Sequence, residues 1–387
     1  MASEDRILTS HVGSLPRAPE LIAALGRRQD GDGPADFEPL VARAVAEIVQ
    51  RQVAAGLDIV NDGEASKPSY STYIQERLTG FGEIDAARLP RERHREREEF
   101  RDYYAKSAAA AGSESRRKLA CIGPVALRDR NSLERDLANL ARAVGQSRPL
   151  AGFMTAASPG VIARFHPNAY YPSSQAYREA LGVAMREEYE AIVQAGFILQ
   201  VDCPDLASGW TTVFADRDER EFVAECETSI AILNEALRNV PAERARLHLC
   251  WGNYEGPHIH DIALESILPT ILKAKPATLS FEGANPRHAH EWEVWKRIKL
   301  PDGKRLMPGV LDTLSNYVEH PELVAQRIES YAQIVGRERV IAATDCGFET
   351  FMGACRVHPT IVWKKFEAMA EGARIASDRL WGRRKSA

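Results

Sequence analysis

The sequence predicts an α/β barrel of the (β/α)8 type, on the strength of three observations. Short apolar runs typical of strands alternate with helical segments along the whole chain of 387 residues. Polar residues gather where these runs end, and the carboxyl ends of barrel strands are where such enzymes build active sites. No glycine-rich phosphate-binding sequence follows any run, which disfavours an open doubly wound sheet. We therefore expect a single catalytic domain over residues 1–387.

The first unit is a strand, a helix and a second strand. The segment that begins at Arg6 starts as a strand and breaks at Gly13, and Pro16 fixes the turn. Apolar residues recur at helical spacing over 37–55, and a second strand-like run follows at 57–64.

A charged segment at about 81–117 then interrupts the pattern. Its stretch 91–99 mixes basic and acidic residues at high density, which is typical of a solvated helix or arm. We expect an inserted helical arm that could serve in contacts between subunits of a homo-oligomer. Nine strand-like runs are present and the barrel takes eight, so we assign the run at 118–127 to the insertion.

The rest of the chain repeats the order of strand and helix. Strands are expected at 150–155, 197–202, 246–250, 278–282, 306–312 and 340–347. Helices are expected at 133–144, 174–195, 219–237, 258–272, 321–335 and 361–377.

The composition excludes several classes of protein. A net charge of −4 gives no reason to expect nucleic acid or an anionic membrane as a partner. No apolar run approaches the ~20 residues that span a bilayer, and no signal peptide is evident. Six cysteines are scattered over the chain, so we expect reduced thiols and a cytoplasmic protein.

A metal site is predicted around residues 246–250. Side chains alternate faces along a strand, so His248 and Cys250 point the same way and can reach one ion. Two later strand ends can add Glu282 and Cys346, which would complete a tetrahedral zinc site. Zinc with two thiolate ligands is suited to lowering the pKa of a substrate thiol, and an oxygen ligand such as Glu282 could leave as that thiol arrives.

These motifs recur in one order along nearly the whole chain, and the set resembles a known family. The segments are Val12-Gly13-Ser14, Asp62-Gly63-Glu64, Val201-Asp202-x-Pro204, His248-x-Cys250, Phe281-Glu282 and Asp345-Cys346-Gly347. They are similar to the C-terminal catalytic barrel of the cobalamin-independent methionine synthases, in its short "core" form. The resemblance implies a TIM barrel of the methionine-synthase and uroporphyrinogen-decarboxylase type.

The resemblance also implies ligands and roles. Zn2+ would be held by four residues: His248, Cys250, Glu282 and Cys346. An amino-acid thiol would be bound by Gly13, Ser14, Glu64 and Asp202, with Glu64 and Asp202 as the catalytic pair. The expected reaction is methyl transfer from 5-methyltetrahydrofolate to homocysteine as a zinc-bound thiolate.

Three alternatives stay open. The start of the chain at 9–17 also resembles relatives that open epoxides with coenzyme M, which would be another zinc-dependent thiol alkyl transfer. A lyase related to uroporphyrinogen decarboxylase would need no metal, and a non-catalytic zinc module would show a closed site without thiol exchange.

One departure from the family's pattern concerns general acid catalysis. After the methyl group is transferred, the rest of the donor must take up a proton. The family's Asp-x-His-Ser segment reads Asp312-Thr313-Leu314-Ser315 here, and a leucine cannot donate a proton. His11, His260 or an ordered water are the candidate donors, unless the alkyl donor has a better leaving group. Leu314→His would separate these possibilities.

Overall fold

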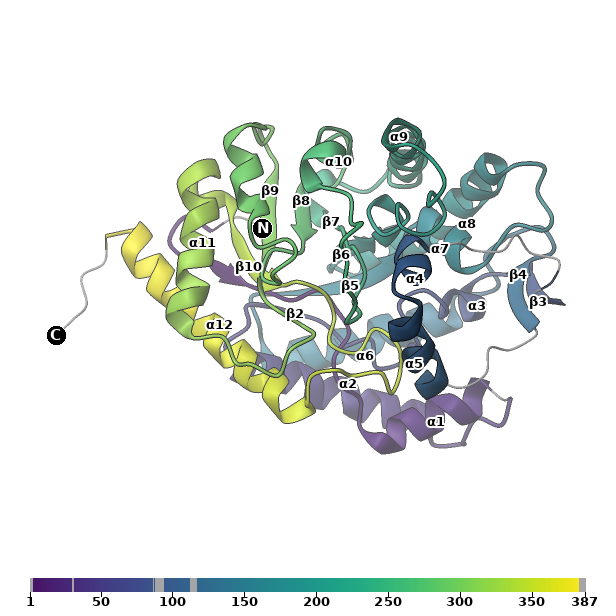
Figure 1. Ribbon diagram of the computed structural model, residues 1–387. Coiled ribbons are helices and arrows are strands. Elements are labelled where there is room, and N and C mark those ends of the chain that lie inside the picture. The colour runs from purple at the N-terminus through teal and green to yellow at the C-terminus, as the bar shows by residue number, and fades with distance from the viewer. Residues whose placement is uncertain (1–2, 30, 86, 88–93, 112–116, 383–387) are drawn as a thin grey trace.

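The computed structural model describes residues 3–29, 31–85, 87, 94–111 and 117–382 and shows a nearly closed parallel barrel wrapped by helices (Figure 1). Eight strands form one sheet in the order β1-β10-β9-β8-β7-β6-β5-β2. The strands are β1 Leu8–Thr9, β2 Ile59–Val60, β5 Ala151–Ala157, β6 Ile198–Asp202, β7 Ala245–His248, β8 Thr278–Phe281, β9 Arg305–Leu311 and β10 Ile341–Thr344. The larger helices around them are α1 Pro19–Gln29, α2 Phe37–Ala54, α6 Asn131–Ser147, α8 Ser174–Gln194, α9 Glu219–Ala236, α10 Leu264–Ile271, α11 Pro321–Val335 and α12 Pro359–Leu380. The predicted α/β barrel is confirmed.

The edge strands β1 and β2 approach each other where the barrel closes. The backbone N–H of Asp58, just before β2, donates to the carbonyl of Thr9 at 3.2 Å. Arg6 forms two hydrogen bonds of 2.7 Å to the Asp58 carboxylate, a paired geometry that fixes the strand starts.

Side chains from the strands fill the barrel in successive layers. A lower apolar layer includes Leu8, Phe153 and Met307. Above it, the buried Arg246 of β7 lies 3.6 Å from the Phe153 ring and donates to Gln200 of β6 at 2.7 Å. Because strand residues alternate faces, positions 248 and 202 form the next layer upward, at the carboxyl ends of these strands.

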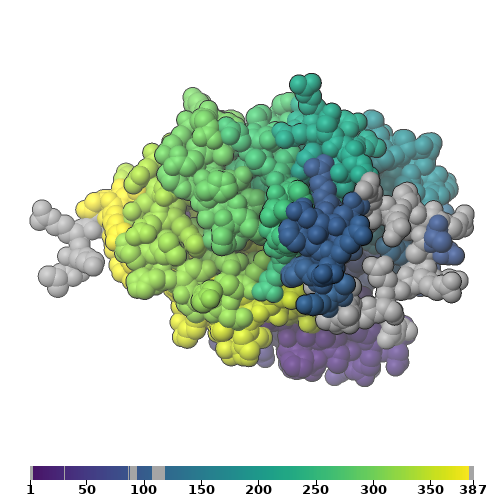
Figure 2. Space-filling view, in the orientation of Figure 1, coloured from purple at the N-terminus to yellow at the C-terminus, as the bar shows by residue number. Residues whose placement is uncertain are grey.

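The run at 118–127 lies outside the barrel, as expected. Strands β3 Phe81–Asp85 and β4 Arg117–Cys121 form a separate antiparallel pair. Short helix α4 Arg95–Glu99 and helix α5 Arg101–Ala111 follow β3 and lie on the surface against the barrel's green segments (Figure 2). Residues 86, 88–93 and 112–116 of the predicted charged segment at 81–117 lie outside the described residues.

The described part of the arm packs against the barrel of its own chain, whereas its charge pattern predicted a solvated helix. The Arg95 guanidinium lies 3.8 Å from the Trp210 ring, in the loop after β6, and donates to the Ala215 carbonyl at 2.9 Å. Glu96 is fully buried and accepts from the hydroxyl of Tyr104 at 2.7 Å and, from the loop after β7, that of Tyr254 at 3.3 Å. The arm therefore connects two of the loops at the mouth of the barrel.

Other local differences from the sequence prediction have simple causes. The helix expected at 258–272 begins only at Leu264, because His258 adopts a positive φ of 53° and Ala263 is extended. Strand β7 ends at His248, so Cys250 lies in the following loop. Helices α1 and α7 Pro159–Phe165 were not predicted. Among the described residues, no helix combines the length and apolarity needed to cross a bilayer.

Candidate metal centre and substrate cavity

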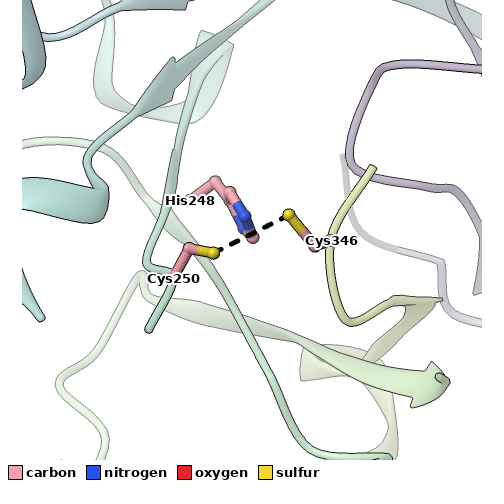
Figure 3. A group of neighbouring side chains, drawn as sticks. All are labelled: His248, Cys250 and Cys346. Carbon is pink, nitrogen blue, oxygen red and sulfur yellow. Dashed lines mark hydrogen bonds between the residues drawn. The ribbon is translucent and has the colours of Figure 1, made fainter. Parts of the chain in front are cut away.

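Three of the predicted metal ligands converge at the carboxyl end of the barrel. The ligand atoms of His248, Cys250 and Cys346 all lie within 4.8 Å of one another, and all three residues are buried. His248 ends β7, Cys250 follows it by two residues, and Cys346 follows β10 (Figure 3). The side chains point toward one another from two segments far apart in the sequence.

The imidazole of His248 is prepared to bind a metal. Its Nδ1 lies 3.3 Å from the Ser280 hydroxyl, while its Nε2 is buried without a hydrogen-bond partner. Burial, with the nearby Arg246 charge, lowers the pKa of His248 to about 3, so the ring is neutral. A neutral imidazole with one nitrogen held by a neighbour and the other unpaired is the usual form of a histidine ligand.

The two sulfur atoms have the spacing of ligands to one ion. The Sγ atoms of Cys250 and Cys346 are 3.7 Å apart. That is much longer than a disulfide bond of ~2.05 Å, and it matches the roughly 3.8 Å expected between two thiolates on a tetrahedral zinc. The hydrogen bond with Cys346 and burial raise the pKa of Cys250 well above its usual range, so two adjacent thiolates here require a cation. The donor set therefore fits zinc.

Glu282, the fourth predicted ligand, is close by but belongs to a different set of contacts. Its Oε1 accepts the backbone N–H of Trp251 at 2.8 Å. Its Oε2 accepts from Asn285 at 2.8 Å and from Arg287 at 2.7 Å. Among the described residues, the group whose ligand atoms lie within 4.8 Å of one another consists of His248, Cys250 and Cys346 and does not include Glu282.

Glu64 offers an open carboxylate oxygen beside the cluster. It adopts a left-handed backbone conformation with φ 57°, which is strained for a non-glycine residue and often marks a functional position. Its Oε1 accepts from the Thr155 hydroxyl at 2.8 Å, whereas Oε2 is buried without a partner. Such an oxygen can accept a hydrogen bond from a bound ammonium group.

Asp202 lies across from it, at the end of β6. Its Oδ1 accepts from the Gln200 side chain at 2.7 Å. Burial, with the charge of Glu64, raises the pKa of Asp202 to about 8. Two buried carboxylates of this kind are stabilised when a cation binds between them.

Gly13 and Ser14 form the turn next to these groups. A Cβ on Gly13 would lie 2.7 Å from Oε1 of Glu64, so a glycine at this position lets the turn lie close to the Glu64 carboxylate. The Ser14 hydroxyl lies over Gly347, where a Cβ would come within 2.1 Å of it. Ser14 is thus adjacent to the Cys346 loop.

One cavity of about 410 Å³ contains the metal cluster and most of the predicted substrate residues. Ser14, Glu64, Asp202, His248, Cys250 and Cys346 all line it. Residues that sequence reasoning did not select also line it: Tyr70, His94, Arg97, Arg164, Asn253, Tyr254 and Phe351. His94 and Arg97 come from the arm, and the charge density of that stretch was the available signal.

The two histidines predicted as candidate proton donors are not among the residues that line this cavity. His11 is buried inside the barrel, where its Nε2 lies 2.7 Å from Gln52. His260 pairs with Glu99 of the arm at 2.7 Å. Leu314 lines a separate open groove together with Tyr103 and Arg287. Among the described histidines, His94 and His248 line the cavity of the metal cluster.

Comparisons with known proteins identify the family of the chain. The catalytic-domain model of the cobalamin-independent synthases matches residues 140–359, which is more than half of the chain. The chain is 24% identical to a methionine synthase of Sulfolobus acidocaldarius over 354 residues, covering 90% of this chain and 88% of that one. It is 25% identical to a 2-hydroxypropyl-CoM lyase of Xanthobacter autotrophicus over 401 residues, covering 95% of this chain and 94% of the relative.

A solved structure shares the fold over the whole length. It is a B12-independent methionine synthase from Shewanella sp. W3-18-1 in complex with selenomethionine, with a TM-score of 0.73 and 19% identity, covering 97% of this chain and 99% of that one. Taken with the match to the catalytic-domain model, this leads to one conclusion: the chain belongs to the cobalamin-independent methionine synthase family and is an enzyme of that family.

Proposed function

We propose that this protein is a zinc-dependent thiol S-methyltransferase whose acceptor is an amino-acid thiol, with homocysteine as the substrate and 5-methyltetrahydrofolate as the donor. The observation that carries the proposal is a single cavity that combines a His–Cys–Cys cluster with the unpaired buried oxygen of Glu64. When bound to His248, Cys250 and Cys346, zinc lowers the pKa of a substrate thiol so that it is a nucleophile at neutral pH.

The residues around the cluster supply binding and orientation. Oε2 of Glu64 would accept a hydrogen bond from the α-ammonium group of the thiol substrate, and the positive charge of that group would favour the ionised form of Asp202. Ser14 and the turn at Gly13 would bind the α-carboxylate. In the reaction the substrate sulfur forms a bond to the methyl carbon while the bond from that carbon to the donor nitrogen breaks. The nitrogen keeps the electron pair and takes up a proton.

The charges of the cavity favour an amino acid over coenzyme M as the thiol. Coenzyme M carries a sulfonate and no ammonium group, so the Glu64 carboxylate would repel it. Arg97 and Arg164 line the same cavity from the arm and from α7, where they suit the carboxylates of a methylfolate. The 2-hydroxypropyl-CoM lyase relative nevertheless makes an epoxide and coenzyme M the reaction to test against.

The test pairs two thiols with two alkyl donors. Zinc-loaded protein is incubated with homocysteine or coenzyme M and with methyltetrahydrofolate or epoxypropane, and products are identified by mass spectrometry. We expect methionine to form from homocysteine and methyltetrahydrofolate, and this activity to fall strongly in Glu64→Gln. Turnover of coenzyme M and epoxypropane alone would contradict the proposal.

A further inference from the structure

A buried lysine is linked to the Glu64 carboxylate through a single hydroxyl group. Lys67 follows Glu64 by three residues in the loop after β2 and is 2% exposed. Its Nζ donates to the Thr155 carbonyl at 2.6 Å and to the Thr155 hydroxyl at 3.1 Å, and it lies 4.3 Å from the centroid of the Tyr73 ring. Among the described residues that line the cavity of the metal cluster, neither Lys67 nor Thr155 is found. Any effect of Lys67 on that cavity must therefore pass through a neighbour.

The neighbour is the hydroxyl of Thr155, in β5, which donates to Oε1 of Glu64 at 2.8 Å. A hydroxyl has one hydrogen to donate and two lone pairs that accept. Because Lys67 donates to the oxygen of this hydroxyl, its single hydrogen is directed to Glu64. The series Lys67–Thr155–Glu64 thus has both hydrogen bonds running in one direction, and Oε2 of Glu64 remains the carboxylate oxygen without a partner.

Backbone contacts hold the two ends of this series together. The Lys67 N–H donates to the Glu64 carbonyl at 3.0 Å, which closes a turn over residues 64–67. The buried Arg17 guanidinium donates to the carbonyl of Glu64 at 2.9 Å and to that of Lys67 at 3.0 Å. These bonds hold Glu64 in its left-handed conformation, so the carboxylate starts from a fixed backbone.

The lysine also brings a positive charge to a group of buried carboxylates. Glu64 and Asp202 are both buried and line one cavity. Removing a carboxylate from water disfavours its charged form, whereas a cation nearby favours that form. Burial and the charge of Glu64 raise the pKa of Asp202, and the charge of Lys67 opposes this shift. Lys67 therefore offsets negative charge at the predicted ammonium site.

We propose that Lys67 is a positioning residue that acts through the Thr155 hydroxyl to keep the Glu64 carboxylate charged and oriented, with Oε2 available to the ammonium group of the thiol substrate. The inference rests on the proposed function and deepens it. Selection of a thiol that carries an ammonium group then depends on Lys67 and Thr155 as well as on Glu64.

The test compares two thiols that differ only in the ammonium group. Homocysteine carries this group, and 4-mercaptobutanoate has the same carbon chain, thiol and carboxylate without it. Binding of each thiol to the zinc-loaded protein is measured by isothermal titration calorimetry. No methyl donor is present, so the measurement does not require turnover.

The variants change one member of the series at a time. Lys67→Met removes the charge and keeps a side chain of similar length. Thr155→Val removes the hydroxyl and keeps the branched shape, whereas Thr155→Ser keeps the hydroxyl. Lys364→Met is the matched control, because Lys364 is exposed on α12 and pairs with Glu367. Zinc content and circular dichroism show whether each variant is loaded and folded.

In the wild type we expect homocysteine to bind at least about 10-fold more tightly than 4-mercaptobutanoate, which lacks the charged hydrogen-bond donor. Lys67→Met and Thr155→Val should each weaken homocysteine binding about 10-fold and leave 4-mercaptobutanoate within about threefold of the wild type. Thr155→Ser and Lys364→Met should match the wild type. Lys67→Met should have no further effect when it is added to Glu64→Gln, because its action passes through Glu64.

The failures are distinguishable. Unchanged or tighter binding of homocysteine in either Lys67→Met or Thr155→Val would overturn this inference and leave the proposed function standing, since a lysine that only repelled the ammonium group would give tighter binding. An equal loss for both thiols would show a merely structural role and would overturn it as well. If Lys67→Met does not fold, Thr155→Val and Thr155→Ser decide. A folded, zinc-loaded wild type that binds the two thiols equally, or binds neither, would overturn both the inference and the proposed function.

Discussion

The Sγ atoms of Cys250 and Cys346 lie 3.7 Å apart, although the residues are 96 positions apart in the chain. Each sulfur is carried by the loop after a different strand, and Asn253 joins these loops by donating to the Gly347 carbonyl at 2.8 Å. Asn253 also accepts from the Thr313 hydroxyl at 3.0 Å, which ties in the loop after β9. The barrel framework therefore holds the two sulfur atoms close together without a metal, so the site is preorganised for metal binding.

Cys346→Ser should remove most of the bound metal. The hydroxyl that replaces the thiol is a poor zinc ligand, so we expect zinc affinity to fall by at least about 100-fold, more than the loss of a supporting residue outside the ligand set causes. The measurement is zinc content after dialysis together with chelator competition. Cys355→Ser is the control, because Cys355 is partly exposed and donates to the Val357 carbonyl. Equal zinc content in both variants would contradict the metal centre.

Glu64→Gln should weaken binding of the amino-acid thiol while leaving the metal in place. Loss of a hydrogen bond to a charged group costs about 1.5–3 kcal/mol, so the KM for the thiol should rise roughly 10- to 100-fold. Steady-state kinetics with varied thiol and fixed donor measure this. Glu47→Gln, on the exposed face of α2, is the matched control. A variant with unchanged KM would show that Glu64 does not contact the substrate.

Leu314→His should leave turnover within about twofold of the wild type, because Leu314 lines a groove separate from the metal cavity. Leu314 is not among the residues that line the cavity of Cys250, so we expect an imidazole there to stay away from a donor bound beside Cys250. The kcat with saturating thiol and methyltetrahydrofolate is the quantity to compare. A large rise in kcat would mean that the donor enters through this groove, and would relocate the proton donor to position 314.

The pH dependence of stability should report on His288. Its Nδ1 lies 2.8 Å from Glu291 and its Nε2 lies 3.2 Å from Asp261. Burial opposes protonation, but hydrogen bonds to Asp261 and Glu291 outweigh it and raise the pKa of His288 from 6.5 to about 9. The charged form is favoured by folding, so its stabilisation is complete below pH 6.5 and is lost as pH rises through 9.

His288→Gln should therefore lower the free energy of unfolding by about 3 kcal/mol more at pH 6 than at pH 10. Urea denaturation at both pH values, at equal metal content, measures the difference. His260→Gln is the control, since His260 and Glu99 form a half-exposed pair that contributes little. A pH-independent effect of His288→Gln would show that His288 is neutral in the folded protein.

The alternation of strands and helices was enough to predict the barrel from the sequence. It can be recognised there because strand and helix periodicities are local properties of the chain. The ligand cluster of His248, Cys250 and Cys346 was predictable for a related reason. The carboxyl ends of parallel strands all meet at one end of a barrel, so polar residues at several strand ends must come together there.

Only the tertiary structure decided what surrounds that cluster. The arm places His94 and Arg97 in the cavity, and its charged pattern alone indicated a solvated surface. The charged partner of Glu282 is Arg287, five residues later, in a turn whose backbone N–H groups are bound by Asp345 from the loop after β10. Side-chain direction in loops is set by such long-range contacts, whereas periodicity specifies only which residues share a face.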